Sequence, residues 1–288
     1  MVDVVNDNRM TRGIEFALME DSGLGDLTSE AIVDDDAIGE GEIVCKGRGI
    51  VAGLGAVELV FRLCDQSSKF VQIKTDGAVV HPADVVARVN GRLRGILRGE
   101  RVALNLLQRM SGIATLTRAY VEAVAGTRAK ITDTRKTAPG LRVFDKWAVR
   151  LGGGVNHRLG LDDMMLIKDN HIAAAGGITK AIEACRRYAS ARQVDVAIEV
   201  ETKSLAEVEE TLRCSGVTRI MLDNVPVADM KRAVDLINGR VEVEGSGGIS
   251  LENVRAYAET GVDFLSVGAL THSVRALDLS LELSWTTS

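Results

Sequence analysis

Cationic side chains gather in one stretch of the sequence, between Lys130 and His171. The chain as a whole carries a net charge of −5, so this stretch is a local exception. Positive charge concentrated on an acidic protein indicates a small anionic ligand rather than a polyanion. The cations of the stretch, many of them beside glycine or proline, are Arg135, Lys136, Arg142, Lys146, Arg150, Arg158 and Lys168.

The segment DTRKTAPGLR (133–142) carries the first two of these candidates. The guanidinium of Arg135 can form a fork with a carboxylate, whereas Lys136 offers a compact charge to a phosphate or a second carboxylate. Pro139-Gly140 favours a turn that would hold both cations in place. Taken alone, the segment would equally suit a surface loop with two solvated cations.

A second basic segment, DKWAVRLGGGVNHRLGLDDMMLIKDNH (145–171), contains three consecutive glycines followed by His157 and Arg158. Glycines allow the backbone to approach a ligand or a neighbouring strand without a side-chain clash. A lone histidine is more often structural, but beside these glycines, Arg158 and Lys168 we interpret His157 as a ligand-binding residue.

Acidic and glycine-rich groups supply complementary chemistry further along the chain. Glu201 and Asp223 suit ribose hydroxyls directly or through Mg²⁺, or alternatively neutralise the nearby cations. EGSGGI (244–249) and VGALTHS (267–273) expose backbone N–H groups of the kind that bind phosphate. Paired on the last two strands of a barrel, they predict a monophosphate site.

These groups follow strands of an alternating β/α pattern. Helices are expected between strands at 173–190, 203–214, 226–237 and 250–259, and this alternation predicts a parallel sheet in a (β/α) barrel or a variant of it. Catalytic groups of barrels lie at the carboxyl ends of strands. The β-branched runs are 129–134, 164–169, 194–201, 218–224, 241–248 and 263–269.

The first half of the chain is less regular. A helix is expected within residues 1–30, an apolar helix over 56–64 and a hairpin over 75–91. Apolar residues at helical spacing from Glu100 to Val124 predict a long helix that links two domains.

Bulk composition bounds the class of protein. Hydrophobic residues make up 46% of the 288 residues and charged residues 26%, as in a protein with a sizeable core. The negative charge and the absence of an apolar run of about 18 residues argue against nucleic acid and membrane partners. Four widely spaced cysteines suggest neither a zinc site nor disulfides. We therefore expect a cytoplasmic protein.

Together these segments resemble the quinolinate phosphoribosyltransferase family, also called nicotinate-nucleotide pyrophosphorylases (carboxylating). The resemblance follows the family order across almost the whole chain. It is carried by EDSGLGDLTS (20–29), GERVALNLLQRMSGIAT (99–115), DTRKTAPGLR, GGGVNHRLGL (152–161), LIKDNH (166–171), IEVE (198–201), MLDN (221–224), GSGGI (245–249) and VGALTHS.

The resemblance implies an α/β fold, with an N-terminal α/β sandwich domain over residues 1–112 and an open, incomplete TIM-like α/β barrel over 113–274. Residues 275–288 would pack on the first domain. It also implies a homodimer, or a larger even homo-oligomer, with a shared active site that Arg101 of one subunit enters from the other.

The resemblance further implies the reaction and the role of each site residue. Quinolinate would react with phosphoribosyl pyrophosphate, with Mg²⁺ as cofactor and Lys136, Glu201 and Asp223 as catalytic residues. Glu201 and Asp223 would hold the metal, directly or through water. Quinolinate would be bound by Arg101, Arg135, Lys136, His157, Arg158 and Lys168, and the 5′-phosphate by Ser246, Gly247, Gly248, Gly268 and His272.

Three alternatives stay open at this point. The first is a paralogue of the same fold with another acceptor, such as the pyrophosphorylase-like protein linked to molybdenum transport. The second is a Schiff-base aldolase that uses Lys136 or Lys168. The third is a non-catalytic sensor of a phosphorylated ligand.

Overall fold

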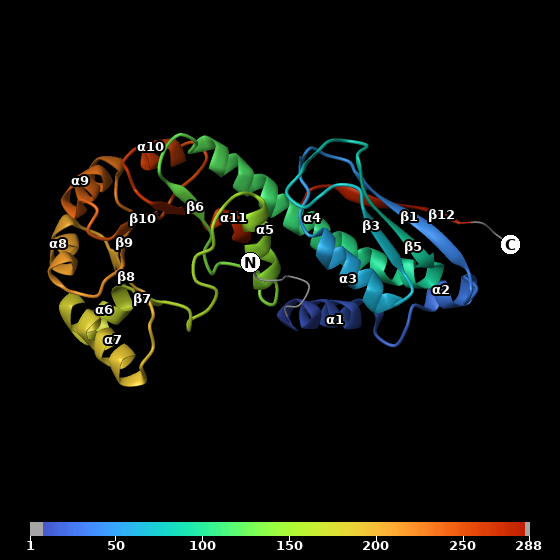
Figure 1. Cartoon of the computed structure of the whole chain (residues 1–288), viewed down its shortest axis with the longest axis horizontal. Coiled ribbons are helices and arrows are strands. Elements are labelled where there is room, and N and C mark those ends of the chain that lie inside the picture. The colour runs from blue at the N-terminus through green and yellow to red at the C-terminus, as the bar shows by residue number, and fades with distance from the viewer. Residues whose placement is uncertain (1–7, 286–288) are drawn as a thin grey trace. The chain divides into compact units, whose positions relative to one another are not determined.

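The computed structural model describes residues 8–285, and Figure 1 labels their helices and strands. The chain folds as two compact units, each assembled from distant segments. The first unit comprises the chain up to Arg118, Thr137–Gly153 and the chain from Leu270 onward. The second unit comprises Ala119–Lys136 and Gly154–Ala269.

The first unit is built on a four-stranded antiparallel sheet. Its order is β12-β1-β5-β3, so the last strand of the chain pairs with the first. Buried and exposed positions alternate along the first half of β1, as expected for a sheet with one covered face. The strands are β1 (Ile38–Cys45), β3 (Lys69–Gln72), β5 (Val85–Arg92) and β12 (Leu279–Trp285).

The predicted hairpin over residues 75–91 is wrong. The strand β4 (Val79–Val80) pairs with β2 (Gly49–Ile50), whereas β5 pairs with β1 and β3. Between β4 and β5 the chain turns at Ala83, whose φ is 72°. Alternation of residue types fixes which side chains share a face, but it does not fix which strand becomes the neighbour.

Helices cover the first unit. The predicted N-terminal helix is α1 (Asn8–Ser22), and a second short helix, α2 (Leu27–Ile32), follows it; residues 1–7 lie outside the described part. Helix α3 (Leu54–Cys64) lies beside α1 and β3. The long helix α4 (Leu93–Ala123) begins directly after β5, earlier than predicted, and its side chains Leu107, Met110 and Ile113 are fully buried.

A buried ion pair fixes helix α5 (Arg142–Leu151) within the first unit. Arg109 of α4 donates from Nε to Asp145 Oδ1 at 2.7 Å and from a terminal nitrogen to Oδ2 at 2.8 Å. Asp145 is completely buried and also accepts the backbone N–H of Ala138. The pair therefore ties the 138–145 segment to α4.

The second unit contains a six-stranded parallel sheet with the order β6-β11-β10-β9-β8-β7. Within this unit β6 and β7 are the first two strands along the chain, and they form the two edges of the sheet, so the barrel is open rather than closed. Five of the six strands fall within the predicted runs, and β8 extends one residue beyond the run 194–201. The six strands are β6 (Lys130–Thr132), β7 (Met165–Ile167), β8 (Ile198–Thr202), β9 (Arg219–Asp223), β10 (Glu242–Ser246) and β11 (Phe264–Ser266).

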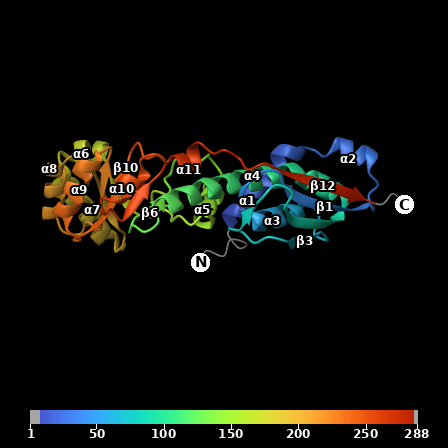
Figure 2. The ribbon, with the colours of Figure 1, turned by 90° about the horizontal axis from the view of Figure 1, so that it is seen from above.

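Helices of the second unit lie on the convex side of the curved sheet, as Figures 1 and 2 show for α7, α8 and α9. They alternate with the strands, as predicted, except that two helices instead of one lie between β7 and β8. The helices that follow β7 to β11 are α6 (Asp169–Ala175), α7 (Ile178–Arg192), α8 (Leu205–Arg213), α9 (Val227–Ile237), α10 (Val254–Ala258) and α11 (Ala269–His272), the last of which runs into the first unit.

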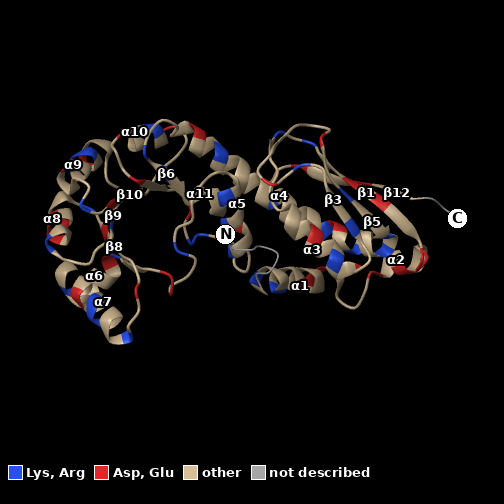
Figure 3. Cartoon of the chain, viewed as in Figure 1, with Lys and Arg blue, Asp and Glu red and all other residues tan. Residues whose placement is uncertain are grey.

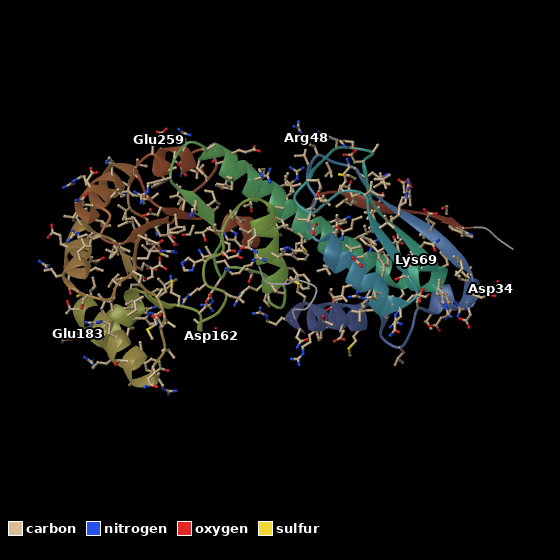
Figure 4. All side chains as sticks on the ribbon, in the orientation of Figure 1. Asp34, Arg48, Lys69, Asp162, Glu183 and Glu259 are labelled. Carbon is tan, nitrogen blue, oxygen red and sulfur yellow. The ribbon has the colours of Figure 1, made fainter. Side chains whose placement is uncertain are left out.

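The two faces of the curved sheet differ in chemistry. On the convex side, Ile198 and Val200 of β8 pack against Ile178 and Ile182 of α7. Side chains alternate along a strand, so Glu199 and Glu201 point to the opposite, concave side. Barrel interiors are usually filled by branched apolar residues. Figure 3 shows charged positions on strands as well as outer helices, and Figure 4 shows side chains filling the space that the sheet encloses.

Candidate active site

Two basic segments meet at β6. Val155 forms a parallel bridge with Thr132, so the chain from 155 onward runs beside the end of this strand. The completely buried Asp133 then accepts the side-chain amide of Asn156 at 2.6 Å and the backbone N–H of His157 at 2.9 Å. This carboxylate joins the loop that carries Arg135 to the segment that carries Arg158.

Arg135 and Arg158 are consequently brought together. Burial lowers the pKa of the Arg158 guanidinium, and the neighbouring charge of Arg135 lowers it further. The Nε atom of Arg135 is buried and has no hydrogen-bond partner among residues 8–285. Arg158, which is only 9% exposed, donates to the carbonyl oxygen of Met164 at 3.0 Å. Two neighbouring guanidinium groups, one of them buried, with an unused donor form an anion site, and guanidinium geometry suits a carboxylate.

Lys168 and Glu201 extend this site to the other end of the sheet. Lys168 follows β7 and its Nζ lies 2.7 Å from Oε2 of Glu201, which is 7% exposed. Lys136, in contrast, is exposed, and its backbone N–H donates to Thr134. Lys168 and Glu201, both predicted site residues, therefore form an ion pair at the carboxyl ends of β7 and β8.

The phosphate candidates lie where β9 and β10 end. Ser246 is the register partner of Asp223, and the backbone N–H of Asn224 donates to the carbonyl of Ser246 at 2.8 Å. Gly247 and Gly248 both have positive φ, of 90° and 61°, and a Cβ at Gly247 would lie 2.3 Å from Asn224 Oδ1. Only glycine fits this turn, whose successive backbone N–H groups suit an anion.

The remaining predicted residues are distributed between the two units. Gly268 follows β11 in the second unit, whereas Arg101 and His272 belong to the first unit. Arg101 is an exposed residue of α4, and His272 is an exposed residue of α11 whose Nδ1 lies 2.7 Å from Ser273 Oγ.

His157 is almost completely buried, at 8% exposure. Its Nδ1 accepts the backbone N–H of Arg158 at 2.8 Å. Its Nε2 lies 3.0 Å from Oε2 of Glu199 and 3.5 Å from Oε2 of Glu244. Both ring nitrogens therefore face groups of the protein.

Glu199 and Glu244 form a buried carboxyl pair on the concave side of the sheet. Both are 0% exposed, and Arg219 contacts Glu244 at 3.1 Å. Burial raises the pKa of each carboxyl group to about 7. The charge of Glu199 raises the pKa of Glu244 further, the charge of His157 lowers it, and Arg219 opposes both shifts.

The sequence interpretation gave no role to Glu244 or Arg219, and it assigned the carboxylate at the end of the 194–201 run to Glu201 rather than to Glu199. One signal was available, because IEVE (198–201) and VEVE (241–244) both repeat glutamate at a spacing of two. In strands, such spacing places both acids on one face.

Comparisons with known proteins agree with this architecture. The family model described as "Quinolinate phosphoribosyl transferase, N-terminal domain" matches residues 26–111, and the model of the corresponding C-terminal domain matches residues 113–282. A Nicotiana tabacum protein named quinolinate phosphoribosyltransferase [decarboxylating] 1b is 47% identical over 94% of this chain and 81% of its own length.

Bacterial relatives match over nearly their full length. A probable nicotinate-nucleotide pyrophosphorylase (carboxylating) of Bacillus subtilis is 43% identical over 97% of this chain and 95% of its own. The crystal structure of NadC from Streptococcus pyogenes superposes with a TM-score of 0.89 at 42% identity, covering 95% of this chain and 96% of that one. The chain belongs to the quinolinate phosphoribosyltransferase family.

Proposed function

We propose that this enzyme transfers the phosphoribosyl group of phosphoribosyl pyrophosphate to quinolinate, with release of pyrophosphate and carbon dioxide, to give nicotinate mononucleotide. The names of its relatives support this reaction. The observation that carries the proposal is the pair of neighbouring guanidinium groups of the buried Arg158 and the partly buried Arg135, whose buried Nε is an unused donor and calls for an anion. Quinolinate is a dianion whose two adjacent carboxylates would meet that requirement.

In this proposal quinolinate is bound by Arg135, Arg158 and Lys168, together with Arg101 of a second subunit. Two arginines and a lysine would offset the two carboxylates and leave the pyridine nitrogen unprotonated. The nitrogen must keep its lone pair, because it is the nucleophile. Positioning beside the sugar donor would then contribute several kcal/mol of the barrier.

The sugar donor would occupy the ends of β8 to β11. The backbone groups of Ser246, Gly247, Gly248 and Gly268, with the side chain of His272, would hold the 5′-phosphate. Lys136 would attend the pyrophosphate. Glu201 and Asp223 would hold Mg²⁺, directly or through water, because carboxylate oxygens at adjacent strand ends suit this ion. The bound ion would neutralise the leaving pyrophosphate.

The chemistry follows from these charges. The bond from the ribose C1 to the pyrophosphate oxygen breaks, and its electron pair leaves with pyrophosphate. Positive charge develops on C1 and the ring oxygen, where Glu201 and Asp223 would offset it. The pyridine lone pair forms the new bond to C1. The ring is now cationic, so the pair left at C2 when carbon dioxide departs lies next to a positive charge, and that carbon then takes a proton from solvent.

The proposal extends to the assembly and its compartment. A homodimer or larger even homo-oligomer would place Arg101 of one subunit in the site of the other. Four free cysteines suit a reducing compartment such as the cytoplasm. None of the helices within residues 8–285 has the length and apolarity to cross a bilayer.

A product assay tests the reaction. The chain is incubated with Mg²⁺, phosphoribosyl pyrophosphate and quinolinate labelled in the C2 carboxyl group. We expect nicotinate mononucleotide, pyrophosphate and labelled carbon dioxide in equal amounts. Release of carbon dioxide without the sugar donor would contradict the order of steps, and no mononucleotide with both substrates would reject the function.

A further inference from the structure

A single buried side chain joins the two basic segments of the candidate site. Asp133 directly follows β6 and is 0% exposed. Its Oδ1 accepts the backbone N–H of His157 at 2.9 Å, and its Oδ2 accepts the side-chain amide of Asn156 at 2.6 Å. All three residues belong to the second unit. Because the carboxyl group is fully buried, it offers no surface to a substrate, and these contacts are those of a support.

The place of these hydrogen bonds in the backbone ladder explains why an aspartate stands at this position. Val155 donates to the carbonyl of Ile131 at 2.9 Å and accepts the N–H of Asp133 at 3.3 Å, as in a parallel ladder. The next rung of such a ladder would join the N–H of His157 to the backbone carbonyl of Asp133. The side chain of Asp133 accepts that N–H instead. The carboxyl group therefore replaces the main chain as acceptor where β6 ends.

This replacement frees the backbone after Asp133 from the ladder and still holds the second segment. Arg135 lies two residues after Asp133, and Arg158 directly follows His157. Neither arginine lies in a helix or a strand. The neighbouring charge of Arg135 lowers the pKa of the Arg158 guanidinium, so the two cations repel each other. A fixed backbone is needed to hold such a pair at the spacing that suits a carboxylate.

We propose that Asp133 is a positioning residue for quinolinate, which fixes Arg135 and Arg158 relative to each other through its hydrogen bonds to residues 156 and 157. The bond to His157 is made by the backbone N–H, so it leaves the role of the imidazole ring unchanged, a contact with quinolinate as the family resemblance implies. The inference rests on the proposed function and deepens it, because it adds a group behind the substrate contacts.

Three substitutions at position 133 separate the hydrogen bonds from the other effects of this side chain. Asp133→Ala removes both acceptor atoms. Asp133→Asn keeps an oxygen for the N–H of His157, and the amide of Asn156 can rotate to place its own oxygen opposite the new NH₂ group. Asp133→Glu keeps the carboxyl group but adds a methylene in a fully buried place, so it displaces both acceptors.

Hydrogen exchange of the ligand-free full chain, followed by mass spectrometry, tests the support directly. Peptides that cover residues 154–160 report the N–H of His157. We expect these peptides to exchange about tenfold faster in Asp133→Ala than in the wild type, and within about twofold of the wild-type rate in Asp133→Asn. Peptides that cover β8 and β9 should keep their wild-type rates. Unchanged exchange of residues 154–160 in Asp133→Ala would overturn the proposal, whether or not the chain turns over quinolinate.

Kinetics then test whether the support serves quinolinate. In Asp133→Ala we expect the KM for quinolinate to rise by about 100-fold, as for groups displaced by about 1 Å, and the KM for phosphoribosyl pyrophosphate to stay within about threefold. Asp133→Asn should recover most of the loss, whereas Asp133→Glu should not. Equal rises in the two KM values would show a general structural role, and a better recovery in Asp133→Glu would show a role of charge. Either result would overturn the proposal.

Asn156→Ala tests the same support if Asp133→Ala does not fold. The side chain of Asn156 belongs to an exposed residue, and its loss removes only one of the two hydrogen bonds. The KM for quinolinate should rise by about tenfold, the effect of one hydrogen bond to a carboxylate. An unchanged KM for quinolinate in Asn156→Ala, with the fold intact, would contradict the inference.

Asp263→Ala is the matched control in the same unit. Its carboxylate also accepts one backbone N–H, that of Val243 at 2.9 Å, and contacts one side chain, that of Arg128, but it lies at the amino ends of β10 and β11. It should leave both KM values unchanged, and a rise equal to that in Asp133→Ala would overturn the proposal. A wild type that does not turn over quinolinate would reject the proposed function, and hydrogen exchange would still decide whether Asp133 fixes residues 154–160.

Discussion

The buried Glu244 makes a quantitative prediction for folding stability. Its pKa is raised from 4.5 to about 7, first by burial and then by the charge of Glu199. The folded protein therefore holds a proton on Glu244 at pH values where the unfolded chain has lost it. Stability from this group is complete below pH 4.5 and is lost as the pH rises through about 7.

The size of the effect follows from the shift. Each pKa unit corresponds to about 1.4 kcal/mol, so ionising Glu244 in the folded protein costs about 3 kcal/mol. Glu244→Gln replaces the carboxyl group with a neutral amide of the same shape and removes this cost. The difference in unfolding free energy between the variant and the wild type should grow by about 2 to 3 kcal/mol as the pH rises from about 5 to about 8.5.

Urea denaturation followed by circular dichroism, at several pH values across this range, measures the difference. As a control, Glu242→Gln removes an exposed carboxylate that contacts the same Arg219. The difference in unfolding free energy between this variant and the wild type should be constant with pH. If the difference between Glu244→Gln and the wild type were equally constant, Glu244 would be ionised throughout, and our account of the buried carboxyl pair would be refuted.

Three further predictions concern the site and the first unit. Arg135→Ala should lose about 100-fold or more in turnover of quinolinate, with an unchanged circular dichroism spectrum, because one preorganised donor is removed; near-normal activity would remove the main site assignment. Mixing Arg135→Ala with Arg101→Ala should restore part of the activity through hybrid assemblies, and no recovery after confirmed subunit exchange would count against a shared site. Asp145→Ala should lower the unfolding free energy by about 3 to 5 kcal/mol, since it leaves Arg109 without its partner inside the first unit. The control Asp235→Ala removes an exposed ion pair and should change the unfolding free energy by less than about 1 kcal/mol. Equal effects of the two substitutions would contradict the role of burial.

Local features of the sequence determined much of the second unit. Each of the six β-branched runs coincides with a strand to within one residue at its end, because residue type and spacing act within a few residues. The parallel arrangement follows from the helices between them, and it places the strand ends at one edge. That reasoning predicted that the strand ends carrying Lys168 and Glu201 would lie at one edge, and the two side chains form an ion pair at 2.7 Å.

Only the tertiary structure decided which groups meet inside the sheet. Glu244 contacts His157, which lies 87 positions before it by residue number, and no local rule links the two. The hairpin predicted over residues 75–91 failed for the same reason, since strand pairing depends on partners distant in the chain. Local patterns specify the face that a side chain occupies. The neighbours on that face, and therefore the surroundings of a buried histidine, come from the packing of distant segments.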